Sequence, residues 1–344
     1  MFVLGLESSC DDCSAAIVCE AGHGPKLLSI TRKSQDTLHG PYGGVVPELA
    51  AREHLLSLRE VIIEAIDQSG IRVEQIDRIA VTQGPGLVGS LLSMFSAGKA
   101  MAWRQGIPLV AVHHTLGHIN AARFENPNLP FPAIALLVSG GHSHLYLAQN
   151  WVHLGLLQKT RDDAAGEAFD KIARMLDLGY PGGPVVDCCA QKASGPTTPF
   201  TPPKFRDGKA SWSFSGLKTA VKMRIQANPR LKNAGIDDPA VQALCRSFQE
   251  AVAEWLMKPI SAFKHQTGAR SLIVSGGVAC NSKLRSKAKE TADILGLTIA
   301  IPEPKLCTDN GAMIASAGSL LEPIIPAKSV WSLNADPNLP LISL

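Results

Sequence analysis

The sequence lacks the long apolar runs, the export signal and the strong net charge that mark several classes of protein. No apolar stretch approaches the roughly 18 residues of a transmembrane helix, so we expect no membrane span. The first residues, MFVLGLESSC, have neither the basic end nor the apolar core of a secretory signal, which favours a cytoplasmic protein. The net charge is only +3 and neither requires nor excludes nucleic acid, because a local basic patch matters more than the total.

The chain also lacks a second C-x-x-C motif to accompany the one formed by Cys10 and Cys13. Without an export signal, we expect all eight cysteines to be reduced thiols. A single C-x-x-C indicates redox chemistry, half of a zinc site, or only small residues buried near a turn. Because no second motif completes a set of four thiolates, the third interpretation is the simplest.

The sequence does contain enough apolar material for a sizeable core, with 45% hydrophobic and 18% charged residues. Its 344 residues are typical of about two domains. Apolar runs alternate with helical periodicities, which predicts an α/β protein. We expect strands at residues 2–6, 14–18, 76–81, 108–112, 133–138, 145–148, 271–274 and 298–301. We expect helices at residues 48–68, 163–176, 216–226, 241–265 and 310–321, and one that follows residues 84–89 and ends at residue 102.

A proline-rich segment at residues 126–132 divides this pattern into two halves. We expect an N-terminal lobe over residues 1–128, completed by residues 322–344, and a C-terminal lobe over residues 129–321, with a ligand cleft between them. The string Val-Ser-Gly-Gly occurs twice in the second half, each time after an apolar strand. After the first copy, we expect residues 145–148 to form a hairpin with residues 133–138. Paired glycines in strand-to-helix turns let backbone N–H groups approach a phosphate closely.

Two histidines four residues apart, His114 and His118, are candidate metal ligands. If a helix has begun by His114, both imidazoles lie on one face and can bind one ion; if Thr115 is the N-cap, the geometry is looser. Two ordinary polar histidines are the alternative. Asp309 would complete a set of two histidines and one carboxylate that suits iron or zinc. From the residues alone, however, Asp309 is better explained as the N-cap of the helix that follows it.

A basic stretch in the second half is compatible with an RNA-binding surface. The aromatic residues Trp212 and Phe214 are interleaved with its cations, as in many RNA-binding surfaces. One acid, Asp207, lies among the basic residues, which are Lys204, Arg206, Lys209, Lys218, Lys222 and Arg224.

Ten ordered motifs lie between about residue 2 and residue 320, and one of them is the pair His114 and His118. The other nine are GLESSCD (5–11), YGGVVPELA (42–50), GPGLVG (84–89), LVSGGH (137–142), DAAGEAFDK (163–171), YPGGP (180–184), SFSGLKT (213–219), SGGVACN (275–281) and CTDNGAM (307–313). Together these motifs closely resemble one family, the bacterial tRNA N6-adenosine threonylcarbamoyltransferases.

The resemblance implies an actin-like fold of two related lobes, as in sugar kinases, Hsp70 and actin. It implies one metal ion, usually iron(II) with zinc as the alternative, bound by His114, His118 and Asp309. The implied acyl donor is threonylcarbamoyl-AMP. The residues that match the family's donor contacts are Leu137, Val138, Ser139, Gly140, Gly141, Asp170, Gly183, Asp187 and Asn281.

Asp11 and Asp12, directly after the first strand, are the candidates for accepting or orienting a proton of the N6 amine. In actin-like ATPases, acids at this place face the phosphate or its metal. The family commonly has glutamate where Asp12 stands and threonine where Cys13 stands. Asp12 therefore keeps the charge on a side chain that is one methylene shorter.

The implied reaction moves the threonylcarbamoyl group to N6 of adenosine 37 in tRNAs that read codons beginning with A. The implied partners are tRNA, a related non-catalytic actin-like paralogue and a small ATPase. Two other classes stay open. A zinc metallopeptidase would have glutamate after its first histidine, where this chain has Thr115. A non-catalytic nucleotide-binding scaffold would have no use for the three metal ligands.

Overall fold

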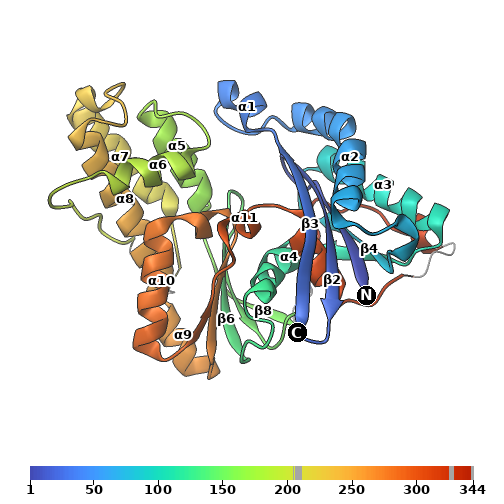
Figure 1. Ribbon diagram of the computed structural model, residues 1–344. Coiled ribbons are helices and arrows are strands. Elements are labelled where there is room, and N and C mark those ends of the chain that lie inside the picture. Colours follow the sequence, from blue (N-terminus) through green and yellow to red (C-terminus); the bar gives the residue numbers. More distant parts are fainter. Residues whose placement is uncertain (204, 206–210, 325–328, 342–344) are drawn as a thin grey trace.

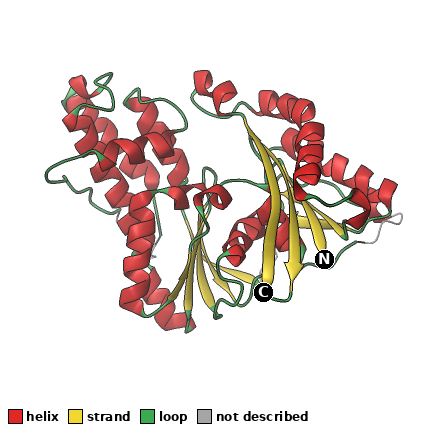
Figure 2. Ribbon diagram, in the orientation of Figure 1, coloured by secondary structure: helices red, strands yellow, loops and turns green. Residues whose placement is uncertain are grey.

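The computed structural model describes residues 1–203, 205, 211–324 and 329–341, which fold around two five-stranded sheets (Figures 1 and 2). The strand order is β3-β2-β1-β4-β5 in the first sheet and β10-β9-β6-β7-β8 in the second. The strands of the first sheet are β1 (Phe2–Glu7), β2 (Asp12–Ala21), β3 (Gly24–Ser34), β4 (Arg78–Gly84) and β5 (Leu109–His113). Those of the second are β6 (Ala133–Val138), β7 (Ser143–Ala148), β8 (Leu154–Lys159), β9 (Ser271–Ser275) and β10 (Thr298–Ala300).

The two sheets have the same topology. In each, a first strand pairs antiparallel with the second and parallel with the fourth, as β1 does with β2 and β4, and β6 with β7 and β9. The third strand extends the antiparallel side and the fifth extends the parallel side. This repetition confirms the predicted α/β architecture of two related halves.

Helices separate and cover the sheets in layers. Helices α2 (Pro47–Ser69) and α3 (Val88–Gln105) pack on one face of the first sheet through a core that includes Leu4, Val61 and Phe95. Helices α4 (His114–Asn120) and α12 (Gly311–Gly318) share another core with residues of both sheets. The remaining cover of the second sheet is built from α5 (Ala165–Met175), α6 (Gly182–Gln191), α7 (Phe214–Ala227), α8 (Pro239–Met257), α9 (Ile260–Thr267) and α10 (Ser282–Leu295).

Helix α12 lies flush on the first sheet because small residues line the contact. A Cβ on Gly311 would lie 2.6 Å from the carbonyl oxygen of Gly5 in β1, and a Cβ on Gly117 of α4 would lie 2.7 Å from Ile314 in α12. The backbone N–H of Gly311 also donates to Ser14 Oγ of β2 at 3.0 Å. These contacts hold the start of α12 against β1, β2 and α4, although about 190 residues separate α4 from α12 in sequence.

One local prediction was wrong. The single helix predicted at residues 241–265 is two helices, α8 and α9, because Pro259 has no N–H to donate and stands between them as the N-cap of α9. The first Val-Ser-Gly-Gly turn joins β6 to β7, which confirms the predicted hairpin. The second does lead through a short 3₁₀ turn, Gly277–Cys280, into α10.

The C-terminal segment returns to the first sheet. Leu109 of β5 pairs with Ile324, Gln83 accepts from the N–H of Asp336, and His113 Nε2 lies 3.1 Å from the carbonyl oxygen of Leu339. The lobe boundaries at residues 128 and 321 stay a prediction. No helix in the described part of the chain combines the length and apolar character that crossing a membrane requires.

Candidate metal centre

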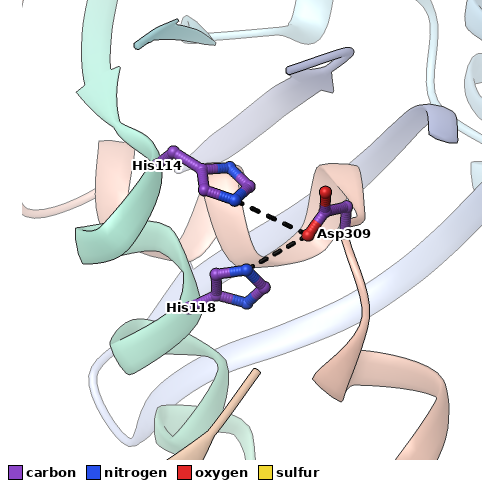
Figure 3. Close-up of side chains that lie close together, drawn as sticks. All are labelled: His114, His118 and Asp309. Atoms are coloured by element: carbon purple, nitrogen blue, oxygen red, sulfur yellow. Dashed lines mark ion pairs between the residues drawn. The ribbon is translucent and has the colours of Figure 1, made fainter. Parts of the chain in front are cut away.

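Helix α4 begins at His114, directly after β5, so the two histidines of the H-x-x-x-H pattern stand one turn apart on it. His113 is the N-cap, and its Nδ1 accepts the N–H of Thr115 at 3.1 Å. The rings of His114 and His118 face one another edge to face, with centroids 4.6 Å apart, and both are buried. The prediction that the imidazoles share one helix face is therefore confirmed (Figure 3).

Asp309 reaches both histidines from the segment that precedes α12 (Figure 3). Its Oδ1 lies 3.1 Å from His118 Nε2 and 3.6 Å from His114 Nε2, and the three ligand atoms all lie within 4.8 Å of one another. Asn310, not Asp309, caps α12, because its side chain accepts the N–H of Met313 at 2.9 Å. The interpretation of Asp309 as the cap was thus wrong, and its carboxylate is left for another role.

The chemistry of these donors fits a metal ion. His118 is fully buried, yet neither of its ring nitrogens has a hydrogen-bond partner among the described residues, although Nε2 lies within ion-pair distance of Asp309. A buried imidazole without partners is unfavourable unless its lone pair is used. Two imidazoles and one carboxylate suit iron(II) or zinc and leave coordination positions open.

Glu7, at the end of β1, orients the first histidine and was not singled out by the sequence reasoning. Its side chain is fully buried, and Oε2 accepts from Thr82 Oγ1 at 2.6 Å and lies 3.1 Å from His114 Nδ1. Ser9 Oγ also lies 3.1 Å from that nitrogen. Such an outer carboxylate fixes the ring and its tautomer, which turns His114 Nε2 toward Asp309. The signal for Glu7 was a carboxylate ending an otherwise apolar strand.

The charges of the centre reinforce one another when no ion is bound. Burial acts to lower the pKa of His114, but Asp309 and Glu7 together raise it to about 9. Burial acts to raise the pKa of Asp309, but His114 and His118 hold it well below its usual range. Protons and a cation therefore compete for the same nitrogens and oxygens.

The two Gly-Gly turns lie against each other beside this centre. Gly140 and Gly141 are exposed, have open space around their Cα atoms, and their N–H groups donate to no atom of the described residues. Gly276 has a φ of +91°, and a side chain there would collide with the carbonyl oxygen of Val138. His142, directly after the first turn, places its ring 6.4 Å from that of His114. Free N–H groups thus lie close to the candidate ligands, which is the arrangement that binds anions.

Asp11 lies between β1 and β2, and Asp12 is the first residue of β2; both side chains are partly buried. Burial raises the pKa of Asp11, and it raises that of Asp12 to about 8, against the opposing effect of Arg32. Asp12 Oδ2 lies 3.6 Å from Arg32 Nη1. A carboxyl group whose pKa lies near neutrality is suited to exchange a proton.

The other expected donor contacts gather at the starts of α6 and α10. Asp170 accepts the N–H of Gly182 at 2.8 Å, and no atom of the described residues lies within 4 Å of a Cβ position at Gly183. Asp187 accepts from the N–H and hydroxyl of Ser282, at 3.0 and 2.6 Å. Asn281 caps α10 and donates to Gln249 at 3.0 Å. These side chains form hydrogen bonds between helices. They therefore stabilise the fold, in addition to any contact that they make with a ligand.

The basic stretch looks different in the structure. Trp212 and Phe214 are buried in the core of the second half, so the interpretation that they form part of an RNA-binding surface was wrong. Lys218 pairs with Asp163 at 2.6 Å, and Arg224 donates to the carbonyl oxygens of Thr198 and Pro199. Lys222 is exposed. Lys204, Arg206 and Lys209 lie outside the described residues.

The C-x-x-C motif is not part of the candidate metal group in the described residues. Cys10 and Cys13 are free thiols, the first partly and the second fully buried. Within the described ranges, the group of histidines, cysteines and acids with metal-ligand spacing is His114, His118 and Asp309. Burial raises the pKa of the Cys13 thiol to about 11.

Comparison with solved structures identifies the fold class of this chain. The chain matches HypF from T. kodakarensis with a TM-score of 0.61 and 14% identity, covering 92% of this chain and 46% of that one. It matches component A of (R)-2-hydroxyglutaryl-CoA dehydratase from Acidaminococcus fermentans with a TM-score of 0.55 and 14% identity, covering 92% and 96%. These similarities, with the duplicated sheets, confirm the two-lobed actin-like fold.

Sequence comparison gives the family. The family model of tRNA N6-adenosine threonylcarbamoyltransferases matches residues 26–316. The enzyme of that name from Geobacter sp. (strain M21) is 48% identical over 92% of this chain and 90% of its own, and that from Kosmotoga olearia is 43% identical over the whole of both chains. The chain therefore belongs to the tRNA N6-adenosine threonylcarbamoyltransferase family, and it is a transferase.

Proposed function

We propose that this chain transfers the threonylcarbamoyl group from threonylcarbamoyl-AMP to N6 of adenosine 37 in tRNAs reading codons that begin with A, releasing AMP. The observation that carries the proposal is the meeting of His114, His118 and Asp309 beside two Gly-Gly turns, in a chain of this family. The acyl donor needs an anion site and an electrophilic centre side by side, and this arrangement supplies candidates for both.

His114, His118 and Asp309 would hold one Fe²⁺ ion, with Zn²⁺ as the alternative, and Glu7 would hold His114 in place. When bound, such an ion supplies Lewis acidity that polarises a donor carbonyl and offsets charge developing on its oxygen. The remaining chemistry falls to residues of the chain.

The residues around the centre would bind and orient the reactants. The N–H groups of Gly140 and Gly141 donate to the phosphate or to the developing oxyanion, in a turn that also contains Leu137, Val138 and Ser139. Asp170, Gly183, Asp187 and Asn281 border the adenosine part of the donor. Holding donor and amine together removes much of the entropic barrier, since the N6 amine is a weak nucleophile.

Asp12, with Asp11 beside it, would accept the proton that N6 loses. In the transfer, a bond forms between N6 and the carbamoyl carbon, and the bond from that carbon to the phosphate oxygen breaks. The pKa of about 8 for Asp12 lies close to neutrality, so its ionised form is present and its protonated form is stable. An Asp12→Asn variant should bind the donor and transfer slowly. Wild-type rates in that variant would remove this role.

The target adenine must leave its stack to reach the centre, as with other base-modifying enzymes. We propose that the basic stretch from Lys204 to Arg224 contacts the tRNA backbone, and Lys222 is its exposed cation in α7. Lys222→Glu should weaken tRNA binding and reduce its salt dependence by about one counterion. An actin-like paralogue and a small ATPase, in the cytoplasm where tRNA is used, complete the proposed assembly.

The two other classes receive less support. A metallopeptidase needs a carboxylate free to activate water, but Glu7 is fully buried and engaged with Ser9, Thr82 and His114. In a non-catalytic scaffold, there would be no reason to bury His118 next to Asp309 with no hydrogen-bond partner for its ring nitrogens among the described residues.

The test combines the purified chain, both partner proteins, threonylcarbamoyl-AMP and a tRNA that reads codons beginning with A, followed by nucleoside analysis. Formation of threonylcarbamoyladenosine, lost in His118→Ala and retained in His153→Ala, supports the proposal, because His153 is an exposed loop residue outside the centre. Absence of the product with every component present would refute it.

A further inference from the structure

Arg32 is a cation next to the candidate centre that the proposed reaction has not used. It lies on β3 opposite Ser14 of β2, and its side chain is 38% exposed. Its Nη1 donates to Thr308 Oγ1 at 2.5 Å and lies 3.6 Å from Asp12 Oδ2. Since Thr308 precedes Asp309, the guanidinium is anchored beside both a candidate ligand and the candidate proton acceptor.

This anchor leaves one edge of the guanidinium free. Nη1 makes both contacts, whereas Nε and Nη2 meet no acceptor in residues 1–203, 205, 211–324 and 329–341. That edge is the fork with which arginine binds two oxygens of a phosphate or carboxylate at once. Because the side chain is fixed through Nη1 and is partly exposed, this edge is organised in advance to bind an anion.

The position of Arg32 indicates which anion it receives. The methyl group of Thr308 lies 3.9 Å from the Cβ position of Gly277, in the second Gly-Gly turn, which packs against the first. Among the described lysines and arginines, Arg32 is the one that pairs with an acid of the group Asp11, Asp12 and Asp309. These acids repel an anionic donor, so a cation at this place offsets the repulsion where the phosphate is expected.

We propose that Arg32 binds the phosphate of the acyl adenylate through its Nε–Nη2 edge, opposite the Gly-Gly turns. The inference rests on the proposed function and adds a donor-binding residue to it. When the bond from the carbamoyl carbon to the phosphate oxygen breaks, the electron pair stays on that oxygen and the phosphate of the departing AMP becomes more negative. The attraction between the guanidinium and the phosphate grows as this charge develops, which favours cleavage of the bond between the carbamoyl carbon and the phosphate oxygen.

Two measurements test the inference, titration calorimetry with AMP and steady-state transfer in the complete assembly with threonylcarbamoyl-AMP varied. Loss of a charge-assisted fork should weaken AMP binding and raise KM for the donor by about ten- to a hundredfold in Arg32→Ala. Arg32→Lys, which keeps the charge and loses the fork, should recover part of both. Lys33→Ala is the matched control, because Lys33 on the same strand pairs with Glu60 of α2, and it should leave both values unchanged.

A purely structural role for Arg32 predicts a different pattern. If Arg32 only positions Asp309 through Thr308, then Arg32→Ala and Thr308→Val should both weaken binding of Co²⁺, and neither should change AMP affinity. That result, or weakened tRNA binding with unchanged AMP binding, would overturn the inference. AMP binding is measured without transfer, so a wild-type assembly that binds AMP through Arg32 but forms no product would count against the proposed function alone.

Discussion

At the scale of single residues, the centre depends on a buried carboxylate that binds no ligand itself. Glu7 accepts hydrogen bonds from the Ser9 N–H and the Thr82 hydroxyl, and it faces His114 Nδ1 at 3.1 Å. Removing its charge should loosen the ring of His114 and leave the hydroxyl and imidazole poorly satisfied. We expect Glu7→Gln to weaken Co²⁺ binding by about ten- to a hundredfold. Absorption titration measures this, with the exposed Glu64→Gln as control; equal affinities would contradict it.

Asp12 gives a residue-scale prediction about pH. Its pKa is raised to about 8 in the folded chain, from an ordinary value of 3.8. Between these two values the folded state holds a proton that the unfolded state has lost, so the free energy of unfolding falls as pH rises through this window and levels off above it. In the metal-free chain, Asp12→Asn should remove this slope and gain on the order of 2 kcal/mol over wild type at pH 8.

Urea unfolding of both chains in the presence of a chelator, at pH 5, 6.5 and 8, measures the difference. The gap should widen with pH, because the asparagine carries no charge to be buried. Parallel stability curves would show that Asp12 titrates normally in the folded state.

The residues of the centre differ in how far the sequence determines them. The spacing of His114 and His118 fixed their common helix face, since four residues make about one turn. Asp309 was assigned by resemblance alone, because its approach to the histidines depends on α12 packing against α4, which no local pattern encodes. Arg32 was not predicted as a site residue for a similar reason, because its partners Asp12 and Thr308 come from distant segments.

At the scale of elements, strands and helices differ in how clearly they could be predicted. Strands β1, β6 and β9 are buried along nearly their whole length and read as plain apolar runs. The edge strand β3 was missed because its exposed positions carry lysine and arginine, which break the apolar pattern. Helix α10 was missed because it buries only Leu284, Ala288 and Ala292 and is otherwise charged.

The contact of α12 with the first sheet gives an element-scale prediction. A methyl group on Gly311 would meet backbone atoms of Gly5, Ala15 and Ala16 at 2.6–2.7 Å, and backbone cannot give way as a flexible side chain can. Gly311→Ala should therefore push α12 off the sheet, lower stability by about 1–3 kcal/mol, and carry Asp309 away from the histidines, weakening Co²⁺ binding.

The matched control for this change is Gly216→Ala in α7. Ser213 Oγ lies 3.7 Å from the Cβ position there, an ordinary van der Waals distance, so the same substitution meets no obstacle among the described residues. It should raise stability by a few tenths of a kcal/mol to about 1 kcal/mol through helix propensity, with metal affinity unchanged. Chemical unfolding and Co²⁺ titration of both variants separate the two outcomes. Equal effects in the two helices would mean that the close approach of α12 is not required.

At the scale of the whole molecule, the centre lies in the layer that joins the two sheets. Helices α4 and α12 share a core with Val3 of the first sheet and Leu137 and Ile273 of the second. An ion held by His114, His118 and Asp309 would connect these two helices directly. Its binding energy should therefore stabilise the folded chain as a unit and not only one loop.

Metal binding should accordingly raise the melting temperature of the whole chain. With free Co²⁺ or Zn²⁺ at a hundred times its Kd, mass action contributes about 2.7 kcal/mol, which corresponds to a shift of roughly 4 °C for a chain of this size. The shift should vanish in His118→Ala and Asp309→Ala and persist in His153→Ala, whose side chain is exposed. It should also shrink as pH falls below about 9, because protonation of His114, whose pKa is raised to that value, competes with the ion. Calorimetric scans at pH 7 and 9 test both parts: a shift that survives in His118→Ala places the ion elsewhere, and one independent of pH means that His114 is not a ligand.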